Sequence, residues 1–375
     1  MKFITKKPPI VSSPDKSYKR LLSLHIALII TSISAIFMNG FYNIPEEAGY
    51  NLDQSFTVFS MIVIGAIVAF LVELVYALSE GDTTKFNSYR GFVDPINTGI
   101  LIALLLPITT PVYVLVLAVI VGTYVGKIVF GGRGYYIFNP ALVGVLFATI
   151  SFSSQLGFAE DVVTPLQGLK LVFTDGAMQV LSMQELLIGN FAEIAVGSTS
   201  IIVLILLFIY LTNTKVIDLR ISGTFLLTVL FMSFGIGYIL WAFDNGSTIG
   251  YMIVNLLTGL TLFGAVFFVS ESVSTPTSRE TKLIYGVTVG LLMMLFRTVS
   301  ENVEGLIYAV LFGNMITPFI NRTVKRSNAK SLRITVAVLI VIVLIATAAI
   351  GFMLQGQLIE LQPAAETALM MGGMM

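Results

Sequence analysis

Long apolar runs alternate with short polar segments along most of the chain. A helix that crosses a bilayer needs about 20 mostly apolar residues. Nine runs approach that length: 21–38, 56–78, 112–130, 194–211, 223–241, 250–269, 283–296, 303–320 and 334–354. Two shorter apolar runs, 97–107 and 139–152, are interrupted or ended by Pro and Gly. The pattern predicts an all-α polytopic membrane protein with about 10 to 11 transmembrane helices.

The distribution of Lys and Arg among the loops favours keeping both short runs. If segment 1–20 is a cytoplasmic basic arm and every run crosses the membrane, all but two of the 21 basic residues fall on the cytoplasmic side. The exceptions are Lys170 and Arg297. Cytoplasmic loops carry an excess of Lys and Arg, and omitting one short run would invert every later loop. We expect a multi-pass protein of the cell membrane with its N-terminus inside and its C-terminus outside.

Composition narrows the class further. The chain is 56% hydrophobic and 11% charged, whereas soluble domains carry about 25% charged residues. A soluble enzyme is therefore excluded. The 21 basic and 21 acidic residues cancel, which argues against a nucleic-acid partner. The chain has no Cys and a single His, so it offers no thiolate ligands and no His cluster for a metal.

The order of the runs divides the chain into two membrane halves, 21–152 and 194–320. An outer loop at 153–193 joins them, a basic cytoplasmic loop follows at 321–333, and a last helix and tail occupy 334–375. With five runs in each half, related halves would be inverted repeats. Thr-Gly occurs in the third run of each half, preceded by Asn at 97–99 and by Leu at 257–259. The fifth run of each half contains an Asn that precedes a Pro. Broken helices in inverted repeats are typical of ion sites near the bilayer midplane, so Asn97, Thr98, Thr258 and Gly259 are candidate ion-path residues.

Charged side chains inside apolar runs require a reason, because each costs about 2.5–3.5 kcal/mol to insert. Glu73 lies within the second run and is either an ion-path carboxylate or a residue near the inner surface. Arg297 ends the run 283–296; it could pair with Glu301, hold a phosphate or flavin edge, or extend to the outer surface. His25, in the first run, is more typical of a packed residue.

A glycine-rich turn at 130–140 is the most unusual stretch. Gly131 and Gly132 permit a tight turn, and Asn139 followed by Pro140 begins a helix whose N–H groups face the turn. No Gly-Lys-Ser/Thr follows, so this turn is not a phosphate-binding P-loop.

The stretch 131–144, GGRGYYIFNPALVG, resembles the GG-x-G-x-x-x-x-NPA motif of the NqrB/RnfD family. These are flavin-carrying membrane subunits of Na⁺-translocating NADH:quinone reductases and of Rnf ferredoxin:NAD⁺ oxidoreductases. FFVSESVSTPT at 267–277 is similar to the family's FFMATDPVTSPTT, with Glu271 in place of Asp. LIYG at 283–286, Phe296-Arg297 and Glu304-Gly305 extend the resemblance, which covers about residues 20–325. It implies a bundle like that of urea transporters.

In this family a Thr in the outer loop carries FMN through a phosphoester bond made by a flavin transferase. The resemblance implies that Thr164, which precedes Pro-Leu, is this tether. The usual Ser-Gly-Ala before the Thr is absent here, and Asp161 and Thr164 could instead align with the family's Asp and Ser. Ser198 also stands where the family has Glu. The resemblance further implies Arg297, Gly131, Gly132 and Asn139 as cofactor contacts, and leaves room for riboflavin or a second flavin.

The function implied is a subunit of a complex that couples flavin electron transfer to transport of Na⁺ or H⁺. The chain has no NAD fingerprint and no ferredoxin-type Cys set, so NADH or ferredoxin would be oxidised by partner subunits. The alternative is a redox-silent solute channel of the same bundle type, because fold does not fix function.

Overall fold

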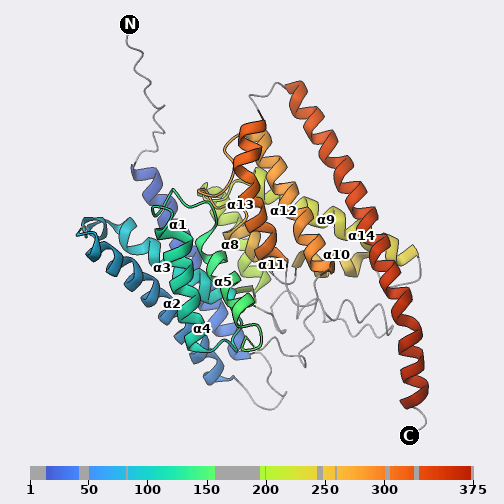
Figure 1. The fold of residues 1–375 in the computed structure, drawn as a ribbon, viewed down its shortest axis with the longest axis horizontal. Helices are drawn as coiled ribbons and strands as arrows, with labels where there is room; N and C mark the ends of the chain where they lie inside the picture. Colours follow the sequence, from blue (N-terminus) through green and yellow to red (C-terminus); the bar gives the residue numbers. More distant parts are fainter. Residues whose placement is uncertain are drawn as a thin grey trace.

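The computed structural model describes residues 14–41, 50–81, 83–156, 195–198, 200–242, 248–257, 260–299, 305–324 and 329–372. Every regular element in these ranges is helical (Figure 1). The predicted all-α class is confirmed for this part of the chain.

The first half contains five α-helices: α1 (Pro14–Phe41), α2 (Leu52–Ser79), α3 (Tyr89–Leu105), α4 (Val112–Ile120) and α5 (Pro140–Ser151). A short 3₁₀ turn (Thr84–Asn87) precedes α3, and α4 continues directly into a π-helix, η2 (Val121–Ile128). The α3 helix begins before the predicted run 97–107 because Ser88 caps its N-terminus and its first turns carry Arg90, Asp94 and Pro95. These residues mark a loop by composition, yet α3 continues through Pro95, which lies inside the helix.

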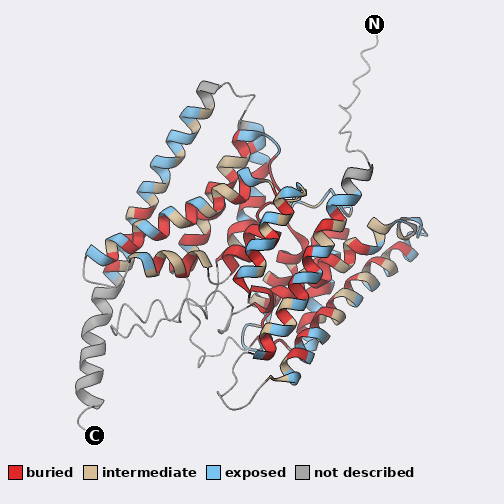
Figure 2. Cartoon of the chain, turned by 180° about the vertical axis from the view of Figure 1, so that it is seen from behind, coloured by how far each residue is buried: buried red, intermediate tan, exposed pale blue. Residues whose placement is uncertain are grey.

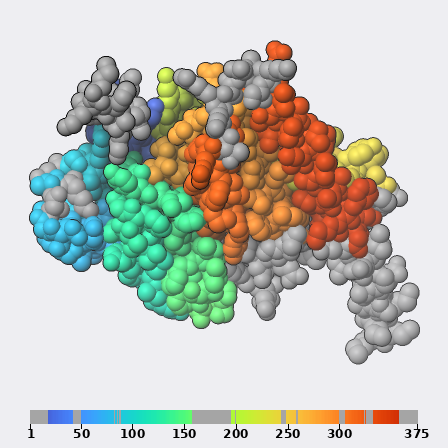
Figure 3. Space-filling view, turned by 45° about the horizontal axis from the view of Figure 1, so that its top comes forward, coloured from blue at the N-terminus to red at the C-terminus, as the bar shows by residue number. Residues whose placement is uncertain are grey.

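The second half is also helical. After a short 3₁₀ turn, η3 (Val196–Ser198), it contains α8 (Ile201–Asn213), α9 (Leu219–Ala242), α10 (Thr248–Leu257), α11 (Leu260–Phe267), α12 (Arg279–Val299) and α13 (Leu306–Thr323). The last helix, α14 (Ala329–Gly372), extends well beyond the predicted run 334–354. Figure 3 shows the first half, blue to green, and the second, yellow to red, largely on opposite sides of the molecule.

Five of the described helices are long and apolar enough to cross a membrane: α1, α2, α9, α12 and α14. The pair α10 and α11, bent by 45°, makes a sixth candidate span. The segments 112–128, 140–151 and 201–213 are apolar but shorter. The chain is therefore a multi-pass membrane protein with short and bent helices. Eleven crossings and an inverted repeat stay predictions.

Small residues bring the helices of each half into close contact. A Cβ on Gly122 would lie 2.7 Å from the carbonyl oxygen of Pro140, and one on Gly126 would lie 3.0 Å from the Pro140 Cα. The glycines therefore let η2 pack directly on α5. Lipid tails are as apolar as Leu, so such close packing, rather than hydrophobic burial, holds membrane helices together.

The last helix differs from the rest of the bundle. It packs on α9 and α12, and Thr347 and Gly351 of α14 contact Gly235 and Ile239 of α9. Only 17% of its most apolar stretch is buried, against 56% for α12. Figure 2 shows buried residues concentrated in the bundle and α14 standing at its edge. Its exposed Val, Ile and Leu side chains suit a lipid environment.

Candidate functional site

Four charged side chains from separate elements of the first half meet in one cluster. The ammonium group of Lys127 contacts the carboxylate of Glu73 and lies 2.6 Å from Asp94 Oδ2. Arg133 Nη1 lies 2.7 Å from Asp94 Oδ1. Lys127 and Glu73 are 2% and 7% exposed, whereas the Arg133 side chain is 40% exposed and covers the cluster from outside. We call these four residues the charge cluster.

The position of Lys127 depends on the π-helix. At the end of this segment the amide of Val129 donates to the carbonyl of Tyr124 at 3.0 Å, across five residues. In the turn that follows, the amide of Gly132 donates to the carbonyl of Lys127 at 3.0 Å. The wider turn is packed on α5 through Gly122 and Gly126. Single π-turns inside α-helices are frequent at functional sites.

An open cavity of about 390 Å³ adjoins the charge cluster. Its lining includes all four cluster residues together with other side chains from the ends of α2, α3 and η2: Tyr76, Ser88, Arg90, Gly91, Ile128, Gly131 and Gly132. Lys127 and Glu73 are therefore buried in the protein but lie next to a space that an ion or water can occupy.

The glycine-rich turn lines one edge of this cavity through Gly131 and Gly132. Gly131, Gly132 and Gly134 have φ values of +101°, +83° and +96°, which residues with a Cβ rarely adopt. Asn139 then caps α5, because its Oδ1 accepts from the amides of Ala141 (3.0 Å) and Leu142 (3.4 Å). The prediction that Asn139-Pro140 begins a helix is confirmed, and the Asn139 amide oxygen serves the backbone.

The same turn reaches the second half through Tyr136, whose hydroxyl donates to Glu271 Oε1 at 2.9 Å. Burial, reinforced by the carboxylates of Glu271 and Asp94, raises the pKa of Tyr136 well above that of an ordinary phenol. Tyr136 therefore stays protonated and remains a donor. Glu271 also accepts from the amides of Val273 and Ser274, so it fixes its own turn while joining the two halves.

The predicted ion-path residues of α3 pair with nearby groups. His25 Nδ1 and Asn97 Oδ1 are 2.6 Å apart, and Thr98 Oγ1 donates to the carbonyl of Asp94 at 3.1 Å. His25 is thus packed against α3, as the sequence favours. Thr98 belongs to the turn that carries Asp94, and neither Asn97 nor Thr98 lines the cavity.

Arg297 lies at the break between α10 and α11. It is 3% exposed, and its Nη1 donates to the carbonyl of Asn255 at 2.8 Å. Thr261 Oγ1 donates to the same carbonyl at 2.9 Å. A helix break leaves carbonyls without their intrahelical donors, and these two side chains replace them. Of the partners predicted for Arg297, Glu301 lies outside the described residues; Asn255 was not anticipated.

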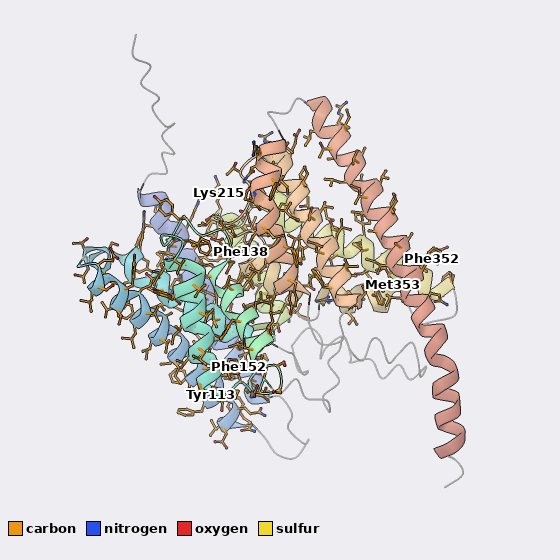
Figure 4. All side chains as sticks on the ribbon, in the orientation of Figure 1. Tyr113, Phe138, Phe152, Lys215, Phe352 and Met353 are labelled. Atoms are coloured by element: carbon orange, nitrogen blue, oxygen red, sulfur yellow. The ribbon has the colours of Figure 1, made fainter. Side chains whose placement is uncertain are left out.

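Arg297 lies near the opposite end of α12 from Arg279. The α12 helix begins at Arg279, close after the turn that holds Glu271, and Arg297 is 18 residues further on. At about 1.5 Å per residue this is about 27 Å. Figure 4 shows Phe138, which follows the glycine-rich turn, above Phe152 and Tyr113 in the first half.

Three predicted residues, Thr164, Thr258 and Gly259, lie outside the described residues. Conversely, Lys127, Asp94 and Tyr136 form the site without having been singled out in the sequence. Only Lys127 carries a signal that would have found it, because it is a Lys within an apolar run.

These features define the class: a multi-pass membrane protein with a buried charge cluster and a broken helix pair. The chain belongs to the NQR2, RnfD, RnfE family, whose model matches residues 4–330. The charge cluster, Tyr136–Glu271 and Arg297 all lie within the matched region, and α14 lies almost wholly beyond it.

Individual relatives agree with this assignment. The B component of the Na⁺-translocating NADH-quinone reductase of Pseudomonas paraeruginosa is 29% identical over 249 residues, covering 62% of this chain and 60% of that protein. The same component from Chromohalobacter salexigens is 28% identical over 273 residues, 69% of this chain and 63% of that protein. The D component of the ion-translocating oxidoreductase complex of Methanosarcina acetivorans is 27% identical over 320 residues, 85% and 94% of the two chains. The chain spans about three fifths of the length of the two quinone-reductase relatives.

Proposed function

We propose that this chain is the membrane subunit of an ion-translocating oxidoreductase complex, in which electron transfer through a flavin drives Na⁺ or H⁺ across the membrane. The observation that carries the proposal is the family match over residues 4–330. The relatives named above belong to complexes that couple redox chemistry to ion transport. Partner subunits would oxidise NADH or ferredoxin.

The charge cluster supports the ionic side of this function. Ionisable residues within membrane segments usually mark ion paths, and Glu73 is buried next to a cavity. Glu73 and Asp94 would hold a cation, and Tyr136 with Glu271 would keep the two halves in register at this end. The bent pair α10–α11, braced by Arg297, adds the broken-helix geometry typical of transporters.

For the redox side we propose Thr164 as the covalent FMN tether, on the strength of the family resemblance alone. When bound, FMN would supply one-electron transfer, and the chain would supply the tether. Among the described candidates, Arg297 donates to the carbonyl of Asn255 at the helix break, about 27 Å along α12 from Arg279. Asn139 is engaged as a cap.

The flavin proposal is tested by fluorescence of the denatured full-length chain in a gel, after expression with a flavin transferase. We expect fluorescence in the parent, none in Thr164→Val, and parental fluorescence in the control Thr174→Val, which alters another Thr of the same predicted loop. Fluorescence that persists in Thr164→Val overturns the tether. Its absence from the parent favours the redox-silent channel.

The transport proposal is tested in sealed vesicles that hold the whole complex. Addition of NADH or reduced ferredoxin is expected to drive uptake of ²²Na⁺, or an interior acidification if H⁺ is carried. Glu73→Gln is expected to reduce the rate at least tenfold, with parental amounts of assembled complex. Ion flux that is independent of the electron donor would contradict the proposal.

A further inference from the structure

Lys127 is the feature that the proposed function does not use. An ammonium group held by two carboxylates occupies the position that a hard cation would take, because oxygen ligands suit such cations and buried charges require partners. The carboxylates of Glu73 and Asp94 both reach this point, from α2 and α3. Both carboxylates and the ammonium group line the adjoining cavity.

We propose that Lys127 is a resident counter-ion of an inner cation site formed by Glu73 and Asp94. A monovalent cation from solution fills this site when the ammonium group withdraws. In the state seen here the lysine closes the site. The inference deepens the proposed function, on which its role in transport rests, but cation binding is an equilibrium property that requires no electron flow.

The charge balance of the cluster favours exchange of cations over binding of an anion. Glu73, Asp94, Lys127 and Arg133 together sum to zero, and the two basic groups are already directed at Asp94. The most buried members are Lys127 and Glu73, while Arg133 approaches from the exposed side. Replacing one ammonium with one cation keeps this balance, whereas an added anion would lie beside two carboxylates.

The π-helix provides a route for the lysine to withdraw. Its hydrogen bonds run across five residues, and a return of this segment to α-helical register changes the direction of every side chain after the shift. One residue corresponds to about 100° of helix rotation. Such a change would carry the Lys127 ammonium away from Glu73.

Lys282 offers a matched control. Its Nζ lies 2.6 Å from Asp218 Oδ2, the same chemistry as the Lys127–Asp94 contact. This pair is only partly buried and belongs to the second half, and it does not line the cavity. Removing Lys282 therefore deletes a lysine–carboxylate contact without affecting the proposed site.

The test measures equilibrium binding of ²²Na⁺ to the purified full-length chain, with choline chloride holding ionic strength constant. Lys127→Met is expected to bind Na⁺ at least tenfold more tightly than the parent, because the competing ammonium is absent. Lys282→Met is expected to match the parent. Adding Asp94→Asn to Lys127→Met, which restores zero net charge, should abolish the gain.

Thermal unfolding supplies a second readout. A cation that binds only the folded state raises Tm, so NaCl should raise the Tm of Lys127→Met over choline chloride by more than it does for the parent. Three outcomes overturn the proposal: no gain in Na⁺ affinity, an equal gain in Lys282→Met, or failure of Lys127→Met to fold in both salts. If Lys127→Met gains affinity but the complex shows no redox-driven uptake, the proposed function fails and this inference stands.

Discussion

Two buried basic side chains, Lys127 and Arg297, are held in opposite ways. Lys127 in the first half contacts two carboxylates, whereas Arg297 in the second donates to the main-chain carbonyl of Asn255. The first arrangement is charge-balanced and lies beside a cavity; the second replaces hydrogen bonds lost at a helix break. Burial of a charge therefore does not indicate its role. The partner does: a basic group held by carboxylates can be exchanged for a cation, whereas one bound to a main-chain carbonyl stabilises the helix break.

The largest effect is expected where the charge balance around Lys127 is removed. Glu73→Gln with Asp94→Asn leaves the ammonium buried without a carboxylate, and breaking a buried pair in this way costs about 3–5 kcal/mol. Adding Lys127→Met to this double variant should recover most of the loss. Thermal unfolding of the three proteins checks the order. A double variant as stable as the parent would show that the carboxylates do not stabilise Lys127.

A smaller loss of stability is expected when Arg297 at the helix break is replaced. Arg297→Met removes a charged donor from the buried Asn255 carbonyl, which keeps the Thr261 hydroxyl. We expect a loss of about 1–3 kcal/mol in stability, measured as a lower Tm, with unchanged Na⁺ affinity. Arg297→Lys should recover part of the loss. A change in Na⁺ binding without a change in Tm would contradict the role of Arg297 as a brace.

The smallest effect concerns the partly exposed pair Asp218–Lys282. Partial burial opposes ionisation of Asp218 and would raise its pKa. The hydrogen bonds from the Lys282 ammonium and the Arg220 amide, together with the positive charges of these two side chains, outweigh burial and lower the pKa. Because the pKa in the folded state is depressed, the stability is present above the unfolded pKa of about 3.9 and is lost as pH falls through the lower folded value. Such pairs contribute at most about 1 kcal/mol.

Thermal unfolding of the parent and of Asp218→Asn, measured from about pH 6 down to about pH 3, a range that includes the unfolded pKa of an Asp, checks this direction of the pH dependence. The difference in Tm between the two proteins should shrink as the solution becomes more acidic. A difference that grows on acidification would mean that the Asp218 carboxylate does not gain from Lys282 in the folded state.

Local signals in the sequence were sufficient for much of the fold. Asn139-Pro140 predicted the start of α5, which the structure confirms, and apolar runs located α1, α2, α9, α12 and α14. The start of α3 was misplaced because Asp94 and Pro95 resemble loop residues. Their place in a helix depends on the Ser88 cap and on the contact with Lys127.

The site itself depends on contacts that no local pattern encodes. Glu73 and Lys127 are 54 residues apart, and neither periodicity nor composition pairs them. For Arg297 the sequence suggested a neighbour four residues away, whereas its described partner lies 42 residues earlier. A candidate carboxylate could be predicted from the cost of placing Glu73 in lipid, but its counter-ion required the three-dimensional arrangement.

The number of residues in the π-helix determines the direction in which the Lys127 side chain points. Deleting a single residue between Gly122 and Gly126 would turn Lys127 by about 100°, although every member of the charge cluster would retain its identity. Such a deletion would thus change which side chain reaches the cation site that we propose at Glu73 and Asp94. Relatives that differ in this count should differ in which side chain faces Glu73.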